Sequence, residues 1–436
     1  MEHYCEKAPL NYCKMISTIC FVISVSCILL AAFRKRDIFS PIYIYLITQS
    51  LTLGIAYLQL DKTMTDFKPF TWLVLLGGSF AFSVGCAVAR LHFHANPSQI
   101  FSPLAFTSKH YHWKLHHSLS WFIYLLVLCC SIPAVSLAGG IPLLSHHLHI
   151  LTSQKMNIGY FTYGYNSGPI AVFLFSISSF KKLCPHKGIA LSSRIMTGIS
   201  LCTLVLLNPT RNSLFFALGL ILINWNFLKK RIDPWLLPLG FALMIPVFIA
   251  LGYAKSQYTD ADRGATMKHV LHLPYIYLAC NYWNLDYALN PDPDNEIHPF
   301  TWGLDATNGF SEIIYLGGSI RTAFDWDNAF NHRIEKTNGL NTVSYLWQSY
   351  KDFWVLGVAA IPFLAGLILT WLYQSLRQKF SLIKHMIYAL CLYIVGWWWF
   401  TESYKNGLYL YWVLALLLIG TLCSNWRNRD HQAQLC

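Results

Sequence analysis

The sequence predicts an all-α polytopic membrane protein, and two observations lead to that fold class. Of the 436 residues, 55% are hydrophobic and only 12% are charged, whereas a soluble globular protein carries about 25% charged residues. The apolar residues also fall in eleven runs, each long enough to span the hydrocarbon core of a bilayer as a helix. The charged residues are too few to cover a soluble domain, and the apolar content excludes a disordered chain.

We expect the eleven runs to be helices, because strands of a membrane barrel are about ten residues long and alternate in polarity. The first run ends at the basic triplet Arg34–Arg36, and the tenth ends in Trp397-Trp398-Trp399, which is typical of the interfacial aromatic belt. Residues 1–436 are therefore expected to form a single integral membrane domain. The runs cover residues 14–33, 40–60, 71–91, 118–138, 159–180, 188–207, 212–228, 234–254, 353–374, 381–401 and 406–423.

The formal charge of +12 is explained by membrane topology and does not indicate a nucleic-acid partner. If Arg34–Arg36 is placed in the cytoplasm and the side alternates at each run, the inner loops hold eighteen basic and three acidic residues. The outer side then holds fourteen basic and seventeen acidic residues. This distribution follows the positive-inside rule. It places the N-terminus outside, the C-terminus inside and residues 255–351 in one large outer loop.

The outer loop, residues 255–351, is rich in aromatic residues and is therefore expected to be ordered. The spacing from His269 to Leu289 predicts a helix lying against the membrane. Aromatic rings beside amides and carboxylates suit a carbohydrate, because sugar C–H faces stack on rings while polar groups bind the hydroxyls. The alternative is that these rings form the core of the loop. The candidate glycan-binding residues are Trp283, Trp302, Asn341 and Tyr345.

Arg211 stands where two predicted spans meet with almost no loop, in the segment Asn208–Arg211. An unpaired guanidinium near the bilayer is costly, so we expect an anionic ligand or a partner for it. A helix is predicted to start at this point, and its N-terminus adds partial positive charge. The alternative is that Arg211 extends to the lipid headgroups as an anchor.

Several short motifs occupy characteristic places in this layout. They are Gly139–Pro142 after an early run, Arg211 at the start of a run, "YWNLDYALN" in the outer loop and "NTVSYLWQSYKDFWVLG" at its end. Over most of the chain this layout resembles that of the Wzy-type O-antigen polymerases, which join oligosaccharide repeat units. That family shows N-V-x-T followed by D-F-G-x-x-G near the end of the loop. Here 341–344 reads Asn-Thr-Val-Ser, Trp354 stands in place of the first glycine, and Gly357 is kept.

The resemblance implies a polytopic glycosyltransferase of the GT-C kind on the periplasmic face of a bacterial inner membrane. The donor is a glycan on undecaprenyl diphosphate, and the acceptor is a hydroxyl of another lipid-linked repeat unit. A flippase and a polysaccharide chain-length regulator are the implied protein partners, beside the membrane lipid itself.

The leaving group implied by this reaction is a lipid diphosphate, on which negative charge develops. Arginines stabilise such charge by bidentate contacts and replace a metal ion in that role. We therefore expect no metal and no cofactor, although Asp292/Asp294 and Asp325/Asp327 have ligand-like spacing in turn contexts. The candidate diphosphate-binding residues are Arg211, Arg263 and Arg321.

The attacking hydroxyl needs a general base, and His332 and His298 are the first choices because the ordinary pKa of histidine is near neutral. Asp352 is the next candidate, and its alternative role is to cap the ninth span.

Three other functions are open. An O-antigen ligase shares the layout and differs in the acceptor. A flippase for the same lipid-linked unit is expected to carry charges inside its spans, whereas here they gather in the outer loop. A membrane di-iron oxidase is suggested by the inner-loop pattern His112-x-x-x-His116-His117, but such enzymes need about eight histidines on one face, and His146, His147 and His149 fall on the other.

The topology is testable with reporter fusions. A reporter fused after Lys230 should read cytoplasmic, and one fused within residues 285–310 should read periplasmic, because the basic residues hold the inner loops in the cytoplasm. A cytoplasmic reading at residue 300 would remove the predicted outer site.

Overall fold

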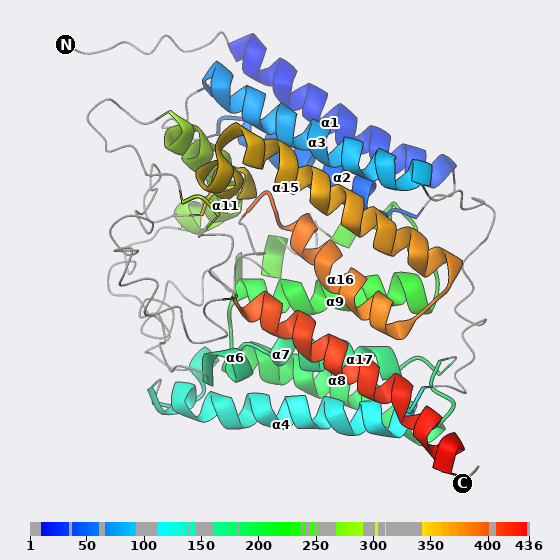
Figure 1. The fold of residues 1–436 in the computed structure, drawn as a ribbon. Helices are drawn as coiled ribbons and strands as arrows, with labels where there is room; N and C mark the ends of the chain where they lie inside the picture. Colours follow the sequence, from blue (N-terminus) through cyan, green and yellow to red (C-terminus); the bar gives the residue numbers. More distant parts are fainter. Residues whose placement is uncertain are drawn as a thin grey trace.

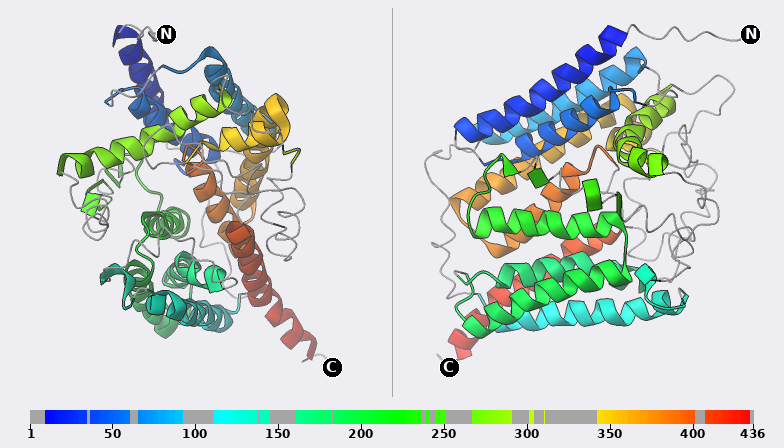
Figure 2. Two further views of the ribbon diagram at one scale, coloured as in Figure 1. Left: turned by 90° about the vertical axis from the view of Figure 1, so that its left-hand side faces the viewer. Right: turned by 180° about the vertical axis from the view of Figure 1, so that it is seen from behind.

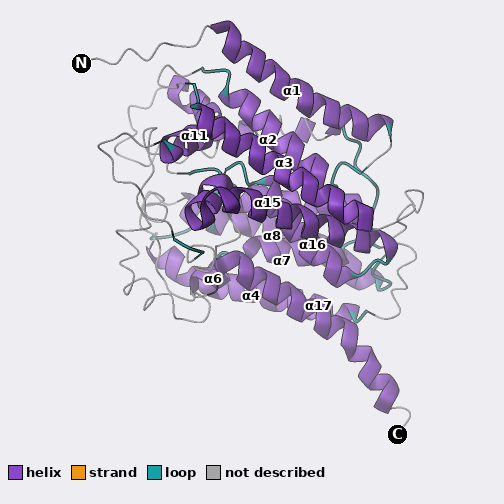
Figure 3. Ribbon diagram, turned by 45° about the horizontal axis from the view of Figure 1, so that its top comes forward, coloured by secondary structure: helices purple, strands orange, loops and turns teal. Residues whose placement is uncertain are grey.

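In the computed structural model the described residues form helices and the turns beside them, and none of the described residues forms a strand (Figure 3). The described residues are 10–34, 37–60, 66–92, 111–137, 139–144, 161–181, 183–236, 239–240, 245–247, 249–250, 267–290, 301–303, 310, 342–400 and 407–433. The helices are α1 (Leu10–Phe33), α2 (Pro41–Ala56), α3 (Pro69–His92), α4 (Trp113–Leu137), the 3-10 helix η3 (Pro142–Leu144), α6 (Phe161–Tyr165), α7 (Gly168–Ser178), α8 (Lys187–Leu207), α9 (Arg211–Leu228), α11 (Met267–Leu289), α15 (Tyr345–Gln378), α16 (Leu382–Gly396) and α17 (Gly407–Ala433).

Ten of the eleven predicted runs fall on these helices, and the eighth, residues 234–254, lies largely outside the described residues. Six described helices are long and apolar enough to cross a membrane, and α2, α7, α9 and α16 are shorter apolar helices. The all-α fold class and the multi-pass membrane character are thus confirmed for the described part, while the count of eleven spans stays a prediction. The six long segments are Cys13–Phe33, Pro69–His92, Trp113–Leu144, Lys187–Leu207, Tyr345–Gln378 and Gly407–Ser424.

The outward-facing side chains of these helices are large and apolar. On α3, for example, Leu73, Leu76 and Phe80 are 63%, 62% and 72% exposed. Contiguous apolar surface of this kind is unfavourable in water, whereas lipid tails solvate it. The exposed faces therefore agree with the membrane assignment made from composition.

The fifth predicted span is not one continuous helix. The structure breaks residues 159–180 into α6 and α7 at Asn166 and Ser167. The break precedes Gly168-Pro169, and proline lacks the N–H that a continuing helix would need. Ser167 bridges the break, because its hydroxyl donates to the Tyr163 carbonyl at 2.6 Å and accepts from Trp412 Nε1 at 3.2 Å.

The long helices lie side by side, and the helix ends that the predicted topology places outside gather at one end of the bundle (Figure 1). We call this end the outer end and the opposite one the inner end, after that prediction. Helices α1, α2, α3 and α15 pack together on one side, and α4, α7, α8 and α9 on the other. Helix α16 contacts α2, α9, α15 and α17 and so joins the two groups. Figure 2 shows α11 crossing the outer end of the bundle, where it packs against α2, α3 and α15.

The helix predicted at 269–289 is confirmed as α11, but protein surrounds much of it. Tyr282 and Leu285 are fully buried, and Ala279 and Cys280 are as well. The middle of α11 is therefore part of the core, and it closes the outer end of the bundle.

Helices α3 and α15 pack backbone to backbone at two glycines. A Cβ on Gly85 would overlap the carbonyl oxygen of Phe363, and a Cβ on Gly366 would overlap that of Phe82. Small residues let membrane helices approach closely, which replaces the hydrophobic drive that is absent in lipid. This crossing fixes α15, and with it the segment at the end of the large loop.

We expect Gly85→Val to destabilise the purified protein in detergent by at least about 2 kcal/mol, because the added side chain forces the α3 and α15 backbones apart. The measurement is the free energy or midpoint of unfolding. Gly77→Val is the matched control, since nothing lies within 4 Å of a Cβ at Gly77 on the same helix. Equal stability of the two variants would contradict the close crossing.

Candidate functional site

The predicted site residues divide into those that the structure describes and those that it does not. Asp352, Trp283, Trp302 and Tyr345 are described with their side chains, and Arg211 by its backbone. The roles of all these residues stay predictions, and the remaining candidates lie outside the described residues: His298, His332, Arg263, Arg321 and Asn341.

The turn before Arg211 is held in place by a polar network. Arg211 is the first residue of α9, as predicted, and Thr210 caps that helix by accepting a hydrogen bond from the Ser213 N–H at 3.4 Å. Thr210 Oγ1 also donates to Asn208 Oδ1 at 3.0 Å. In turn, Asn208 Nδ2 donates to Asn166 Oδ1 at 3.0 Å, in the break between α6 and α7. The break of the fifth span therefore anchors the backbone position of Arg211.

Aromatic contacts connect the start of α9 with α11. Phe215, one turn after Arg211, stacks on Trp397 with ring centroids 6.1 Å apart. Trp397 contacts Phe400 at 6.0 Å, and Phe400 stacks on Tyr277 of α11 at 6.4 Å. The turn after α16 thus joins the arginine turn to the loop helix, so that both belong to one outer end.

Helix α15 is broken near its start, at the residue where the ninth run was predicted to begin, residue 353. Phe353 and Trp354 are not helical, and Trp354 has φ 56° and ψ −143°. Side chains rarely adopt that conformation, whereas glycine adopts it readily. After the break the chain passes so close to the preceding segment that a Cβ on Gly357 would overlap the Ser349 carbonyl oxygen.

Asp352 ends the short segment 345–352 and is fully buried. Its Oδ1 accepts a hydrogen bond from Thr301 Oγ1. The Thr301 N–H donates to the Lys351 carbonyl oxygen at 3.0 Å, so that two bonds tie this loop residue to α15. Asp352 therefore anchors the loop, and its burial keeps it from an acceptor hydroxyl in this conformation.

The anchored segment presents Trp302 at the surface. Trp302 is 81% exposed and has φ 51°. The next residue, Gly303, has φ 84° and lies against the Phe353 ring, where a Cβ would be 2.5 Å from Cζ. An exposed ring held by a constrained backbone suits the predicted contact with a sugar.

Tyr345 and Trp283 are in the core, which favours packing roles for them over the predicted glycan contacts. Tyr345 is fully buried, stacks on Trp398 at 4.2 Å and shares a 2.8 Å hydrogen bond with the hydroxyl of Tyr45. Trp283 is 3% exposed. A sugar reaches neither ring without rearrangement of the outer end.

Asp286 of α11 is a structural residue that the sequence did not single out. It is 4% exposed, and its Oδ1 accepts hydrogen bonds from the Lys68 N–H at 2.8 Å and from Thr71 Oγ1 at 2.6 Å. Because α3 begins at Pro69, this carboxylate lies at a helix N-terminus, where negative charge is favourable. The signal was the lone acid in the motif "YWNLDYALN".

Tyr282, in the same motif, fixes α11 to α2. Its hydroxyl shares a 2.8 Å hydrogen bond with Thr52 Oγ1. Burial raises the pKa of Tyr282 above the ordinary value of a phenol, so the group stays protonated and neutral in the core. The motif "YWNLDYALN" therefore docks α11 onto two helices at once.

The histidine pattern of the di-iron alternative is hydrogen-bonded within the protein. His116 bonds Tyr111 at 2.8 Å and the Leu174 carbonyl at 3.1 Å through its two ring nitrogens. His112 Nδ1 accepts from the Leu115 N–H at 3.0 Å, and His117 Nδ1 contacts Ser193 at 3.1 Å. Within the described ranges, no three His, Cys, Asp or Glu residues are arranged to hold a metal. The two predicted aspartate pairs lie outside those ranges.

Comparison of the chain with family models, with curated proteins and with solved structures finds no match. Function is therefore inferred from the layout of the chain and the geometry of its outer end.

The backbone at Trp354 predicts an unusual response to glycine. Trp354→Gly should be more stable than Trp354→Ala by about 1 kcal/mol, because only glycine adopts this conformation without strain. The measurement is thermal unfolding of both variants in detergent. The control pair is Leu356→Gly and Leu356→Ala, at an exposed helical position where glycine should instead be the less stable by about 1 kcal/mol. If the glycine and alanine variants ranked in the same order of stability at positions 354 and 356, the break in α15 would be contradicted.

Proposed function

We propose that the chain is a bacterial inner-membrane glycosyltransferase that polymerises undecaprenyl-diphosphate-linked repeat units on the periplasmic face. The observation that carries this proposal is the break in α15. The D-F-G-x-x-G pattern of the family that the chain resembles has glycine at two positions, which here are Trp354 and Gly357. Trp354 has a backbone that glycine favours, and Gly357 has no room for a side chain. The backbone thus supports the resemblance even where the side chain departs from it.

In the proposed reaction, a hydroxyl of the acceptor repeat unit attacks the anomeric carbon of the donor glycan. The bond from that carbon to the lipid diphosphate breaks, and the diphosphate leaves with the electron pair. The hydroxyl proton passes to a general base. Since Asp352 is buried against Thr301, His332 and His298 remain the preferred bases.

The leaving diphosphate is assigned to the arginines of the outer side. The backbone of Arg211 supports that role, because it begins α9 at a turn fixed by Asn208 and Asn166. The partial positive charge of the helix N-terminus acts in the same direction as the guanidinium. Each charged hydrogen bond to the phosphate oxygens contributes about 1.5–3 kcal/mol, and Arg263 and Arg321 are proposed to add further contacts.

The glycan is proposed to stack on Trp302, whose side chain is exposed and whose neighbour Gly303 lies against Phe353 at the α15 break. This position would place a sugar next to the segment that carries Asp352 and Trp354. A chain-length regulator and a flippase are the proposed protein partners of this membrane enzyme.

The lipopolysaccharide ladder of a deletion strain separates a polymerase from a ligase or a flippase. Loss of a polymerase leaves a single repeat unit on the core, whereas loss of a ligase or of a flippase leaves none. Retention of the single unit is the expected result. A strain whose core carries no repeat unit would overturn the proposal.

Complementation of that strain tests Arg211. Arg211→Ala should abolish long chains, and Arg211→Lys should restore them poorly at a matched protein level, because an ammonium lacks the planar fork that binds two phosphate oxygens. Arg194→Lys is the control, since Arg194 lies on α8 and its Nε donates to the Ser179 carbonyl at 3.1 Å. Normal long chains from Arg211→Lys would make Arg211 a membrane anchor.

A further inference from the structure

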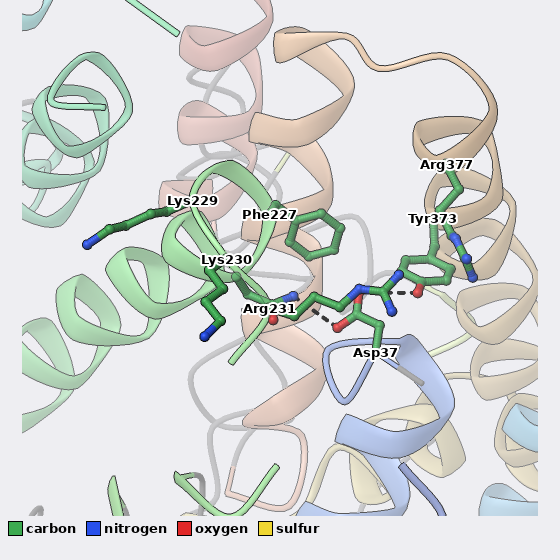
Figure 4. A pocket seen from close by; sticks show the side chains of 8 residues that line it. Asp37, Phe227, Lys229, Lys230, Arg231, Tyr373 and Arg377 are labelled. Carbon is green, nitrogen blue, oxygen red and sulfur yellow. Dashed lines mark hydrogen bonds between the residues drawn. The ribbon is translucent and has the colours of Figure 1, made fainter. Parts of the chain in front are cut away.

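A pocket opens at the inner end of the bundle, opposite the large loop (Figure 4). It lies between the end of α9, the last turns of α15 and the segment that follows α1. The lining residues are Asp37, Asn226, Phe227, Lys229, Lys230, Arg231, Tyr373 and Arg377.

Asp37 forms the floor of this pocket and is 8% exposed. Its Oδ1 accepts from Asn226 Nδ2 at 2.9 Å and from the Phe39 N–H at 3.0 Å. Its Oδ2 accepts from the Tyr373 hydroxyl at 3.2 Å. Three elements therefore meet at one carboxylate, which gives the pocket a fixed base.

The residues that line the pocket carry a net positive charge. Four of the lining residues are cationic and one is acidic. The C-terminal ends of α9 and α15 add roughly half a negative charge each. The carboxylate and the two helix ends thus offset about half of the cationic charge, and the remaining positive charge favours an anion over a neutral or cationic ligand.

Two guanidinium groups approach the floor from different elements. Figure 4 shows Arg231, from the segment after α9, directed toward Asp37 and Tyr373. Arg377, from α15, lies over the Tyr373 ring with its Cζ 5.7 Å from the centroid. Because a guanidinium presents a planar fork of donors, a pair of this kind suits the oxygens of a phosphate.

Lys229 places the pocket at the depth of the lipid headgroups. Its Nζ lies 3.4 Å over the Trp225 ring, and Trp225 is 42% exposed on an apolar face that also exposes Leu222. Tryptophan on an apolar face near a helix end is typical of the membrane interface. The mouth of the pocket therefore lies where phosphate groups of the inner leaflet are found.

We propose that this pocket binds a phosphate-bearing anion at the inner membrane surface, with Arg231 and Arg377 as its bidentate ligands and Lys230 as a further cation. This binding site is separate from the outer end at which we place the glycosyl transfer. Its position favours an anionic phospholipid headgroup, while a soluble phosphate compound offers the same chemistry.

The test uses the full-length protein in a neutral detergent, titrated with phosphatidylglycerol, with phosphatidylcholine and with inorganic phosphate. The measured quantity is the thermal unfolding midpoint as a function of ligand concentration. Phosphatidylglycerol should raise the midpoint and phosphatidylcholine should not, because the latter carries no net charge. In the double variant Arg231→Gln/Arg377→Gln, the apparent affinity for phosphatidylglycerol should fall at least about tenfold, the loss of roughly one charged hydrogen bond.

The matched control is Lys187→Gln/Arg194→Gln, which removes the same charge from α8 outside the pocket lining and should leave the affinity unchanged. If the arginine double variant does not fold, Lys230→Gln should still weaken the binding measurably, since Lys230 is exposed and lines the pocket. A midpoint shift with inorganic phosphate as large as with the lipid would identify a soluble phosphate as the ligand. Equal effects of the two lipids, or equal affinities of the pocket and control variants, would overturn the proposal.

Discussion

The close crossing of α3 and α15 is the constraint on which the outer end of the molecule depends. Gly85 and Gly366 bring two backbones into contact, and farther out Gly78 receives Leu346, whose Cδ2 would be 2.5 Å from a Cβ at that glycine. In lipid no hydrophobic force drives helices together, so packing at small residues must hold them. Both segments of the broken α15 therefore rest on the same helix.

Buried polar groups add specificity to this packing. Asp286 joins α11 to the start of α3, and Tyr45 joins α2 to Tyr345 of α15. Toward the inner side, His385 contacts Asn224 Oδ1 at 2.7 Å and so links α16 to α9. A polar group left unpaired in such surroundings costs far more than one in water, so each pair permits few alternative arrangements of the helices.

The two ends of the bundle present different chemistry. The outer end is aromatic, with an exposed Trp302 beside a buried Asp352, whereas the inner end is cationic around Asp37. Both places are built where a helix ends or breaks, because there the backbone leaves the regular pattern and side chains from several elements converge. The membrane spans separate these two sites, so that each lies at its own end of the bundle.

The sequence by itself determined the helical membrane class, the position of nearly every described helix and the start of α9 at Arg211. These features are local, because in lipid a chain must satisfy its backbone hydrogen bonds within each span, and a hydropathy run records that requirement directly. The tertiary structure alone decided that Tyr345 and Trp283 are core residues and that Asp352 binds Thr301. Those outcomes depend on partners far away in the chain, such as Tyr45 for Tyr345, and no local pattern encodes which side chain arrives opposite another.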